Sequence, residues 1–307
     1  MADLPNSRFH HDRPPTYGRG VIPRTALVTG ANQGLGRALV DGLAVRLHPR
    51  DRVLLTGRDP ARVRAAAAAT PSTGARVEAR VLDVRDPEAI AALAAELGEV
   101  DIVFSNATAR MTPQDDPADR VDAVAQTNNR ATHAVLREFA PRLRPGGRLF
   151  VVASALGTLD KLDERVRPRF AAAAASLAAV EELTTQWCDA VHAGRAERDG
   201  FGTWLNIPSK VLQVAAVRAV ARERRAADLA AGRIVAALCP GLIDTDASRP
   251  WFADMSQAQT PAQAAAWPVD AALDPALDPA FHGELVQFGR VVPWTTGVPV
   301  PHRAVTA

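Results

Sequence analysis

The feature that most constrains this chain of 307 residues is a group of three glycines that directly follows a short apolar run. The run occupies residues 25–29, and the glycines are Gly30, Gly34 and Gly36. Behind them, leucines recur at every fourth position, as on one face of an amphipathic helix: Leu35, Leu39, Leu43 and Leu47. An apolar strand, a glycine turn and a helix in this order predict the first unit of a parallel sheet.

The same alternation continues along the chain. Apolar runs typical of buried strands occur at residues 52–56, 76–84, 101–106, 148–154 and 233–239. Helix-like segments lie between them, at residues 60–69, 87–97, 118–143 and 209–225. This order predicts a doubly wound, Rossmann-type α/β fold, with a parallel sheet of about seven strands and helices on both faces. Such folds bind ligands at the carboxyl ends of the strands.

The chain is expected to form a single domain. Residues 1–24 are polar and contain several prolines, so they predict a flexible arm before a domain of residues 25–307. An insertion of about residues 156–204 interrupts the alternation and includes an alanine-rich helix over residues 170–193. Residues 247–279 are rich in proline and alanine, which predicts loops with short helices.

Charge and composition exclude several functional classes. Lysine and arginine number 36 against 34 acidic residues, and the arginines are spread along the chain, so neither a nucleic-acid partner nor a membrane surface is expected. No apolar stretch reaches the ~18–20 residues of a membrane span. The spacing of Cys188 and Cys239 is typical of neither metal nor redox sites, and His10 and His11 lack nearby ligands, so no metal is expected. A cytoplasmic location is the simplest interpretation.

The glycine turn indicates a dinucleotide. Glycines let the backbone approach a pyrophosphate, and the helix N-terminus supplies free N–H groups and a positive dipole end. The expected contacts are Gly30, Asn32, Gln33, Gly34, Leu35 and Gly36. At the end of the second strand, Arg58 stands where a 2′-phosphate partner would, which favours NADP(H). The adjacent Asp59 leaves NAD open as the alternative, because an acidic residue there holds a 2′-hydroxyl.

Further motifs follow the other predicted strands: Asp83-Val84, Ser105-Asn106-Ala107-Thr108, Thr127-Asn128 on a helix, Ser154, and Pro240-Gly241-Leu-Ile-Asp-Thr245. Together with the glycine spacing they resemble the short-chain dehydrogenase/reductase family over about residues 25–294. The resemblance implies that Asn128 and Ser154 belong to a catalytic set. It also implies further cofactor contacts from Asp83, Val84, Asn106, Ala107, Pro240, Gly241, Ile243 and Thr245.

Within the family the chain is most similar to monomeric carbonyl reductases. The similarity lies in the long insertion, the run Cys239-Pro240-Gly241 and the tail of residues 286–294. It implies a small-molecule carbonyl substrate, or the corresponding alcohol. It also implies a monomer, because the insertion in that branch covers the surface that other members use to dimerise.

The resemblance breaks at the family's Tyr-x-x-x-Lys signature, where this chain has Asn206-Ile-Pro-Ser-Lys210. Lys210 is implied to hold the nicotinamide ribose, but asparagine has no titratable proton and cannot act as a general acid. Tyr17, in the arm, is the only tyrosine. Pro208 disfavours helical geometry at the residue before it, so the helix is expected to begin at about Pro208 and to leave Asn206 on a loop.

Three functions fit these residues. In the favoured one the chain is an NADPH-dependent reductase in which Ser154, Asn206 and Asn128 polarise the substrate. The proton then comes from a water relayed through Lys210, or from Asp160 or Asp163. In the second, Asn206 and Ser154 stabilise an oxyanion in a dehydration, isomerisation or cyclisation. In the third, the chain binds NADP without catalysis.

Several other side chains have a structural and a functional interpretation. Trp187 and Trp204 are expected to pack beneath the insertion, although either could wall a substrate pocket. Trp251, Phe252 and Met255 fall where the family keeps a substrate lid. Surface positions or satisfied core positions are expected for His133 and His192, and Cys239 is expected to be inert. No motif identifies the substrate.

Overall fold

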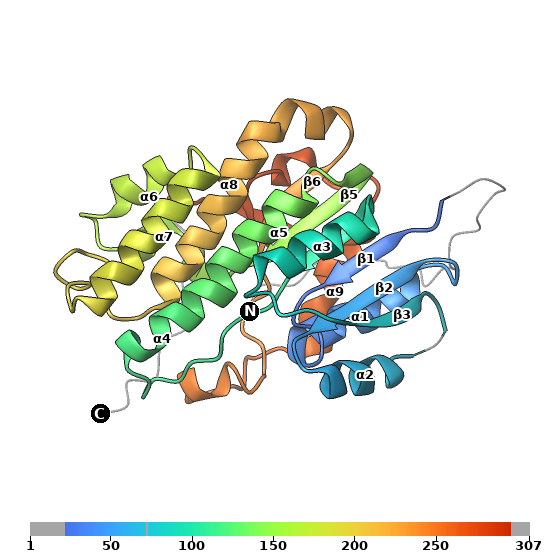
Figure 1. Cartoon of the computed structure of the whole chain (residues 1–307), viewed down its shortest axis with the longest axis horizontal. Helices are drawn as coiled ribbons and strands as arrows, with labels where there is room; N and C mark the ends of the chain where they lie inside the picture. Colours follow the sequence, from blue (N-terminus) through green and yellow to red (C-terminus); the bar gives the residue numbers. More distant parts are fainter. Residues whose placement is uncertain (1–21, 72, 296–307) are drawn as a thin grey trace.

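The computed structural model describes residues 22–71 and 73–295, which build one eight-stranded sheet between two layers of helices (Figure 1). The strand order is β3-β2-β1-β4-β5-β6-β7-β8. The strands are β1 Thr25–Val28, β2 Arg52–Gly57, β3 Arg76–Val81, β4 Val100–Ser105, β5 Leu143–Val152, β6 Ile234–Cys239, β7 Leu285–Gln287 and β8 Arg290–Val292. Strands β1 to β7 are parallel, and only β8 pairs antiparallel, with β7. The predicted doubly wound fold is confirmed, with one short antiparallel strand at the edge.

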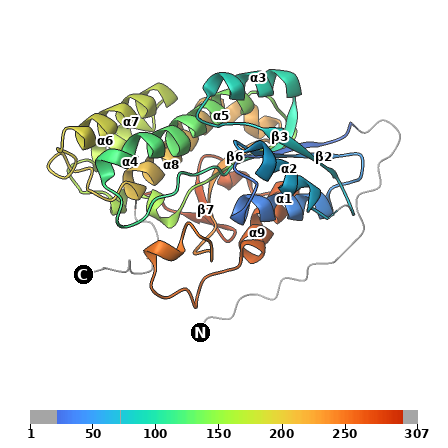
Figure 2. The same ribbon diagram turned by 60° about the horizontal axis from the view of Figure 1, so that its bottom comes forward.

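Helices cover both faces of the sheet. They are α1 Gly34–Arg46, α2 Pro60–Ala68, α3 Pro87–Leu97, α4 Pro117–Val124, α5 Ala131–Phe139, α6 Arg167–Ala173, α7 Leu177–His192, α8 Asn206–Ala230 and α9 Pro261–Leu273. Figure 2 shows α3 and α5 on one side of the sheet and α1 and α9 on the other. Between α4 and α5 the chain forms a π-helical turn, η1 Ala125–Arg130, so the helix predicted over residues 118–143 is interrupted and ends earlier.

The sheet has a hydrophobic core on each face, and successive side chains of a strand pack in one core and then in the other. Leu27 and Leu54 pack in one core with α3, α5 and α8, whereas Val28 and Val53 pack in the other with α1, α2 and α9. Successive side chains of a strand point to opposite faces, so strands buried on both sides must be apolar throughout. A central strand such as β6 is therefore a continuous apolar run, whereas β3, at the edge of the sheet, is partly exposed and carries Arg76, Glu78 and Arg80.

The start of α8 differs from the prediction. The helix begins at Asn206, so the expectation that this residue lies on a loop is wrong. The first N–H groups of a helix have no partner within the helix, and a proline in the first turn therefore removes no hydrogen bond. Pro208 occupies such a position and is buried there. Asn206 and Lys210 consequently lie one turn apart on the same helix.

The insertion consists of two helices instead of the single helix predicted over residues 170–193. The chain leaves α6 after Ala173 and re-enters a helix at Leu177, because the Ser176 hydroxyl accepts a hydrogen bond from the N–H of Ala179, at 3.2 Å, and caps α7. Both helices pack against α8 (Figure 1).

The tail contains a longer helix than predicted. Thr260 and Gln263 form a capping box, and α9 continues for 13 residues against α1. Most of the predicted arm, residues 1–24, lies outside the described residues, and so do Tyr17, His10 and His11. Among the described helices, none is long and apolar enough to cross a membrane.

Candidate active site

The carboxyl ends of the parallel strands surround a cavity of about 1270 Å³. Three of the four predicted catalytic residues line it, namely Ser154, Asn206 and Lys210. So does every predicted cofactor contact: Gly30, Asn32, Gln33, Gly34, Leu35, Gly36, Arg58, Asp83, Val84, Asn106, Ala107, Lys210, Pro240, Gly241, Ile243 and Thr245. Apart from Asn206 and Lys210, which lie on α8, these residues follow six different strands, β1 to β6. The parallel sheet brings them together because it places those strand ends at one edge.

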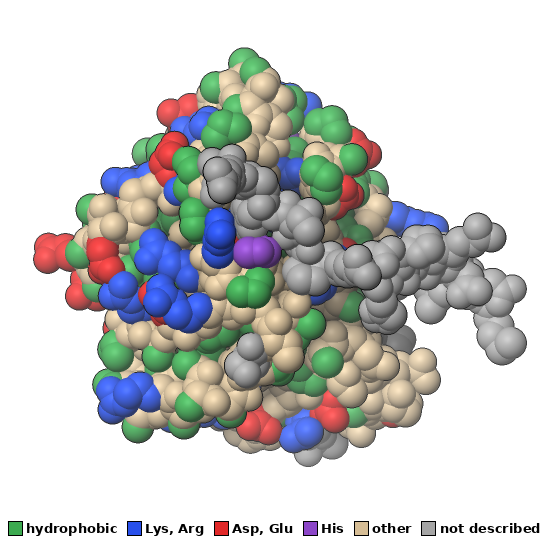
Figure 3. All heavy atoms as spheres, turned by 90° about the vertical axis from the view of Figure 1, so that its right-hand side faces the viewer, with side chains coloured by type: hydrophobic (Ala, Val, Ile, Leu, Met, Phe, Trp, Pro, Cys, Tyr) green, Lys and Arg blue, Asp and Glu red, His purple; other side chains and the backbone are tan. Residues whose placement is uncertain are grey.

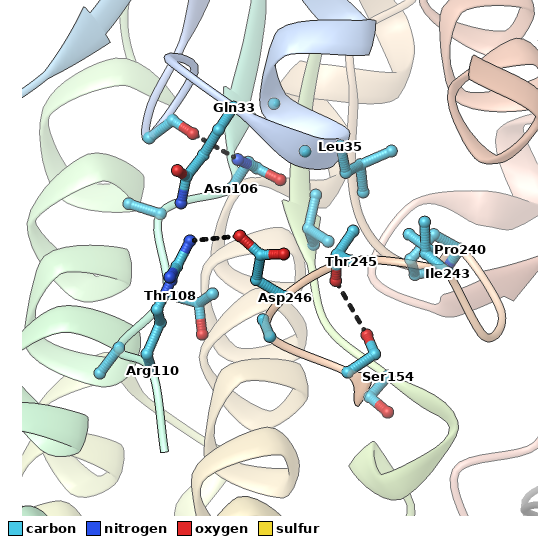
Figure 4. Close-up of a pocket in the computed structure, with 18 of the residues that line it drawn as sticks. Gln33, Leu35, Asn106, Thr108, Arg110, Ser154, Pro240, Ile243, Thr245 and Asp246 are labelled. Carbon is cyan, nitrogen blue, oxygen red and sulfur yellow. Dashed lines mark hydrogen bonds and ion pairs between the residues drawn. The ribbon is translucent and has the colours of Figure 1, made fainter. Parts of the chain in front are cut away.

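The glycine turn lies tightly against the segment that follows β4. A β-carbon on Gly30, which has a φ of 63°, would lie 2.7 Å from the Cα of Ala107. The side-chain nitrogen of Asn106 donates to the carbonyl of Thr29 at 2.9 Å, and the Thr29 hydroxyl accepts from the backbone N–H groups of Asn106 and Ala107. Asn106 therefore holds the turn from below while the turn itself faces the cavity (Figure 4).

The start of α1 suits an anion. Its N-cap residue is Gln33, whose side chain makes no capping hydrogen bond to the first turn. The side chain of Gln33 therefore leaves the N–H groups of the first turn and the positive end of the helix dipole available to a pyrophosphate. The Gln33 side chain instead accepts a hydrogen bond from Arg62.

Two arginines and an aspartate lie where β2 ends and α2 begins. Arg58 and Arg62 both line the cavity. The Asp59 side chain caps α2, accepting from the N–H groups of Ala61 and Arg62 at 2.9 and 3.0 Å. The hydrogen bond from Arg62 is the main reason that the pKa of this carboxyl lies below its usual value. Because the carboxylate is already used as a cap, this corner favours a phosphate over a free hydroxyl pair.

Arg62 is a functional candidate that the sequence analysis missed. An arginine in the first turn of the helix after Arg58 is the signal that would have identified it, since that turn faces the same strand end. Beside this corner, the Arg85 guanidinium binds both carboxylate oxygens of Asp83, the shortest contact being 2.6 Å. This contact lowers the pKa of the Asp83 carboxyl.

At the other end of the cavity, Ser154 and Lys210 lie on neighbouring elements. Ser154 follows β5 and accepts a hydrogen bond from the N–H of Leu156, at 3.2 Å, where the short helix η2 Ala155–Gly157 begins. A β-carbon on Gly157 would lie 2.8 Å from Val214 and 3.2 Å from the carbonyl of Lys210, so this glycine allows the loop to lie directly against α8.

Lys210 is partly buried and its ammonium donates to two neutral acceptors. These are the carbonyl of Val152, at 3.2 Å, and the side-chain oxygen of Gln213, at 2.8 Å. Burial disfavours the charged form, and it lowers the pKa of Lys210 to about 8. A lysine in this state can hold or release a proton near neutral pH.

Asn128 lies beneath the cavity, which contradicts the expectation that its side chain polarises the substrate. The residue is 1% exposed. Its side-chain oxygen accepts from the Thr108 hydroxyl and the N–H of Ala109, and its side-chain nitrogen donates to the Ser209 hydroxyl. Both the oxygen and the nitrogen of the carboxamide are therefore occupied, and it connects η1 to the segment after β4 and to α8.

The two carboxylates proposed as proton sources lie elsewhere. Asp160 binds Thr158 and Lys161, Asp163 binds Arg165, and neither lines the cavity. Four other carboxylates do line it: Asp59, Asp83, Asp244 and Asp246. Each of these four is a cap or an ion-pair partner, so none stands out as a proton donor.

An ion pair joins the loops on either side of the cavity. Arg110 follows β4 and Asp246 follows β6, and their charged groups are 3.6 Å apart (Figure 4). Both side chains are more than half exposed. The segment after β6 is held in place by Gln259, whose side chain donates to the carbonyl of Pro240 at 3.0 Å.

Aromatic side chains wall the remaining part of the cavity. The rings of Trp204 and Trp251 lie 5.6 Å apart, and the indole N–H of Trp251 donates to the carbonyl of Met111 at 3.0 Å. Phe252 also lines the cavity, whereas Met255 does not, so only part of the predicted lid is at the site. Trp187 is fully buried in the core, as the packing interpretation predicted.

The histidines and cysteines occupy other positions. His133 is buried, and neither ring nitrogen has a hydrogen-bond partner among the described residues, so it is not the satisfied histidine that was expected. His192 is exposed and lies 3.1 Å from Asp122. Burial raises the pKa of the Cys239 thiol, which lines the cavity. The described residues contain no group of His, Cys, Asp and Glu side chains placed to hold a metal ion.

A second cavity, of about 630 Å³, lies at the opposite edge of the sheet, where β1, β2 and β3 begin. Basic side chains gather on this face (Figure 3), and the arginines of the cavity are Arg24, Arg50, Arg52, Arg76 and Arg144. None of the residues that line this second cavity is among the predicted catalytic or cofactor-binding residues.

The part of the chain that contains the glycine turn and the segments after β2 to β5 matches a known family. A family profile described as short chain dehydrogenase matches residues 24–195, which is more than half of the chain. The chain belongs to the short chain dehydrogenase family.

Curated relatives of this family match nearly the whole chain. Carbonyl reductase (NADPH) 3 of Rattus norvegicus is 30% identical over 285 residues, which cover 88% of this chain and 98% of the relative. Carbonyl reductase (NADPH) 1 of Bos taurus is 29% identical over 280 residues, with the same coverage.

Solved structures show the same fold at lower identity. Salutaridine reductase from Papaver somniferum has a TM-score of 0.70 at 19% identity, covering 85% of this chain and 99% of its own. An NADPH-bound carbonyl reductase from chicken fatty liver has a TM-score of 0.62 at 19% identity, covering 89% of this chain and 100% of its own.

Proposed function

We propose that the chain is an NADPH-dependent oxidoreductase that reduces a carbonyl group of a small molecule, or oxidises the corresponding alcohol, without a catalytic tyrosine. The observation that carries the proposal is the continuity of one cavity. Arg58 lines this cavity at one end, and Ser154, Asn206 and Lys210 line it at the other. We further propose that the protein acts as a monomer in the cytoplasm, with α6 and α7 packed on α8 where other members dimerise.

The residues at the nucleotide end fit NADP(H). The N–H groups at the start of α1 and the glycine turn would hold the pyrophosphate, and Arg58 and Arg62 would hold the 2′-phosphate. Asp83 and Val84 would contact the adenine, and the segment from Pro240 to Thr245 would cover the nicotinamide. The Asp59 carboxylate already caps α2 and is not free to bind a ribose hydroxyl, which supports NADP(H) over NAD(H).

At the reacting end, bound NADPH would supply the hydride. Ser154 and Asn206 then donate hydrogen bonds to the substrate oxygen as it gains negative charge. Lys210 positions the nicotinamide ribose and, as an ammonium, supplies the proton through a water in the cavity. The aromatic wall of Trp204, Trp251 and Phe252 holds the apolar part of the substrate and excludes bulk water.

Calorimetric titration with NADPH and, separately, NADH tests the cofactor assignment first. We expect NADPH to bind at least about tenfold more tightly, since a 2′-phosphate gains charge-assisted hydrogen bonds from the arginine corner. Equal binding of the two nucleotides would contradict the assignment to Arg58 and Arg62. If neither binds, the reductase proposal is wrong.

The variant Asn206→Tyr tests the reaction. Asn206 lines the cavity one turn before Lys210, so a phenol at this position would regain a titratable proton beside the lysine. We expect carbonyl reduction, measured as NADPH oxidation against a panel of ketones, to rise by about 10²-fold or more. The control is Tyr17→Phe, which should leave the native rate unchanged. A native rate that vanishes in this control would identify Tyr17 as the proton donor instead.

The same panel separates the reductase from the non-redox alternative. Conversion of a substrate without NADPH oxidation would assign dehydration, isomerisation or cyclisation to the site. Nucleotide binding with no conversion of any compound would favour a protein that only binds NADP.

A further inference from the structure

The ammonium of Lys210 is held by a side chain that lies outside the family signature. Gln213 follows it by three residues on α8, and the distance between the lysine Nζ and the amide oxygen of Gln213 is 2.8 Å. The ammonium also donates to the carbonyl of Val152 in β5, and the titratable thiol of Cys239 in β6 interacts with it electrostatically. The partners that accept its hydrogen bonds are therefore neutral.

Both the oxygen and the nitrogen of the Gln213 side-chain amide form hydrogen bonds. The side chain is buried, at 2% exposure. Its nitrogen donates to the main-chain carbonyl of Asn128, at 2.9 Å, and to the Thr132 hydroxyl, at 3.1 Å. One buried carboxamide thus spans the whole gap between the lysine and the helix that carries Asn128.

The carbonyl at the far end belongs to the π-helical turn η1. A π-helical turn is wider than an α-helical one and such turns often occur at functional sites. Here the Asn128 carbonyl also accepts from the Thr132 hydroxyl, at 2.6 Å. The Asn128 side chain fixes the same residue to Thr108, Ala109 and Ser209, so this acceptor is rigidly placed.

We propose that Gln213 is a positioning residue whose amide holds the Lys210 ammonium at the cavity wall and fixes it to the Asn128 carbonyl. An amide carries no titratable proton, so this bridge stabilises the charge but transmits no proton. Lys210 therefore exchanges its proton on the side that faces the cavity. The role of Lys210 in this inference rests on the proposed function.

The chain offers a direct test, because Lys161 and Lys210 are its only lysines. In uniformly ¹³C,¹⁵N-labelled protein, two lysine side-chain signals are expected, and the variant Lys161→Arg assigns them. In the unmodified chain the Lys210 signal should titrate, and the side-chain NH₂ signals of Gln213 should shift with the same midpoint. Gln213 signals that stay fixed while Lys210 titrates would overturn the proposal.

Two variants test the direction of the effect. Gln213→Met removes the acceptor of the charged form, so Lys210 should titrate about one pH unit lower. Gln213→Glu places a carboxylate at the same position, so Lys210 should titrate about one unit or more higher. The matched control is Gln186→Met, on an exposed face of α7, which should leave the midpoint unchanged.

A Lys210 midpoint that is the same in the parent chain and in whichever Gln213 variant folds would also overturn the proposal. Neither nucleotide nor substrate is needed for these titrations. The positioning role can therefore fail while the reductase proposal stands, and NADPH binding can fail while the positioning role stands.

Discussion

A β-carbon on Gly36 would lie 2.4 Å from the side-chain nitrogen of Asn106, and this close approach ties the first helix to the segment after β4. The same β-carbon would lie 2.5 Å from the carbonyl of Gly30, which is backbone and cannot move without opening the turn. The glycine turn and its support are thus one unit, and Gly36 is the residue that lets them fit.

From this contact we expect Gly36→Ala to weaken NADPH binding by more than about tenfold, because the N–H groups at the start of α1 would no longer converge on the pyrophosphate. Calorimetric titration measures the loss. The matched control is Gly42→Ala on the same helix, where the nearest atoms to the new β-carbon belong to the side chain of Val269, at 3.0 Å, and not to the backbone. An unchanged affinity in Gly36→Ala would show that the turn does not hold the nucleotide.

Arg58 and Asp59 should contribute to nucleotide choice very differently. Arg58→Ala should weaken NADPH binding by about ten- to a hundredfold and leave NADH binding nearly unchanged, since only the 2′-phosphate loses a partner. Asp59→Asn should keep the α2 cap and change neither affinity. The control for a general loss of positive charge is Arg64→Ala, an exposed arginine of α2 that does not line the cavity. A loss of NADH binding in Asp59→Asn would assign the carboxylate to the ribose instead.

The state of Lys210 predicts a pH dependence of the reaction. Burial lowers its pKa to about 8, and reduction requires the protonated form as the proton source. The rate at saturating NADPH should therefore be constant below this pH and fall by about tenfold for each further unit above it. Titration of NADPH binding over the same range is the control, because it separates lost chemistry from lost binding. A flat profile between about pH 7 and pH 10 would exclude Lys210 as the proton source.

His133 predicts a pH dependence of stability. Burial is the main cause that lowers its pKa to about 3, from 6.5, and Arg137 and Arg130 add to the effect. Between these values the unfolded chain binds the proton and the folded chain does not. The free energy of unfolding should therefore be highest above pH 6.5 and should fall by up to about 1.4 kcal/mol for each unit toward pH 3.

Denaturant unfolding of His133→Leu at several pH values checks this origin. The variant should lose most of the slope below pH 6.5, because it removes the group that binds the extra proton on unfolding. His192→Leu removes an exposed imidazole from the same protein and should keep the slope. If His133→Leu retains the full slope, other groups are responsible for the acid sensitivity.

Much of the site could be predicted because it depends on local patterns. Gly30, Gly34 and Gly36 follow an apolar run and open a helix, and such a unit has a known place in a parallel sheet. Apart from Lys210 on α8, the other predicted cofactor contacts follow later strands, and parallel strands necessarily bring these ends to one edge. Sixteen predicted contacts therefore line one cavity although the sequence spreads them from Gly30 to Thr245.

Predictions failed where residue type alone does not show which partner a side chain takes, or where packing overrides a local preference. The sequence could not show that Asp59 caps α2, because the alternative, a bound ribose, uses the same residue type. It placed Asn206 on a loop because Pro208 disfavours helix locally, whereas packing of α8 stabilises the helix to its first residue. It suggested Asp160 and Asp163 as proton donors, whereas local ion pairs hold both away from the cavity.

The sequence by itself determined the layered α/β architecture, the cofactor edge and the asparagine at position 206, because each of these depends on residue type and spacing. Only the tertiary structure decided what surrounds Lys210. Gln213 and Asn128 are 85 positions apart, and their contact arises where α8 lies against a π-helical turn. No periodicity encodes such a contact, since it depends on how two helices pack and on which buried polar groups must then find partners.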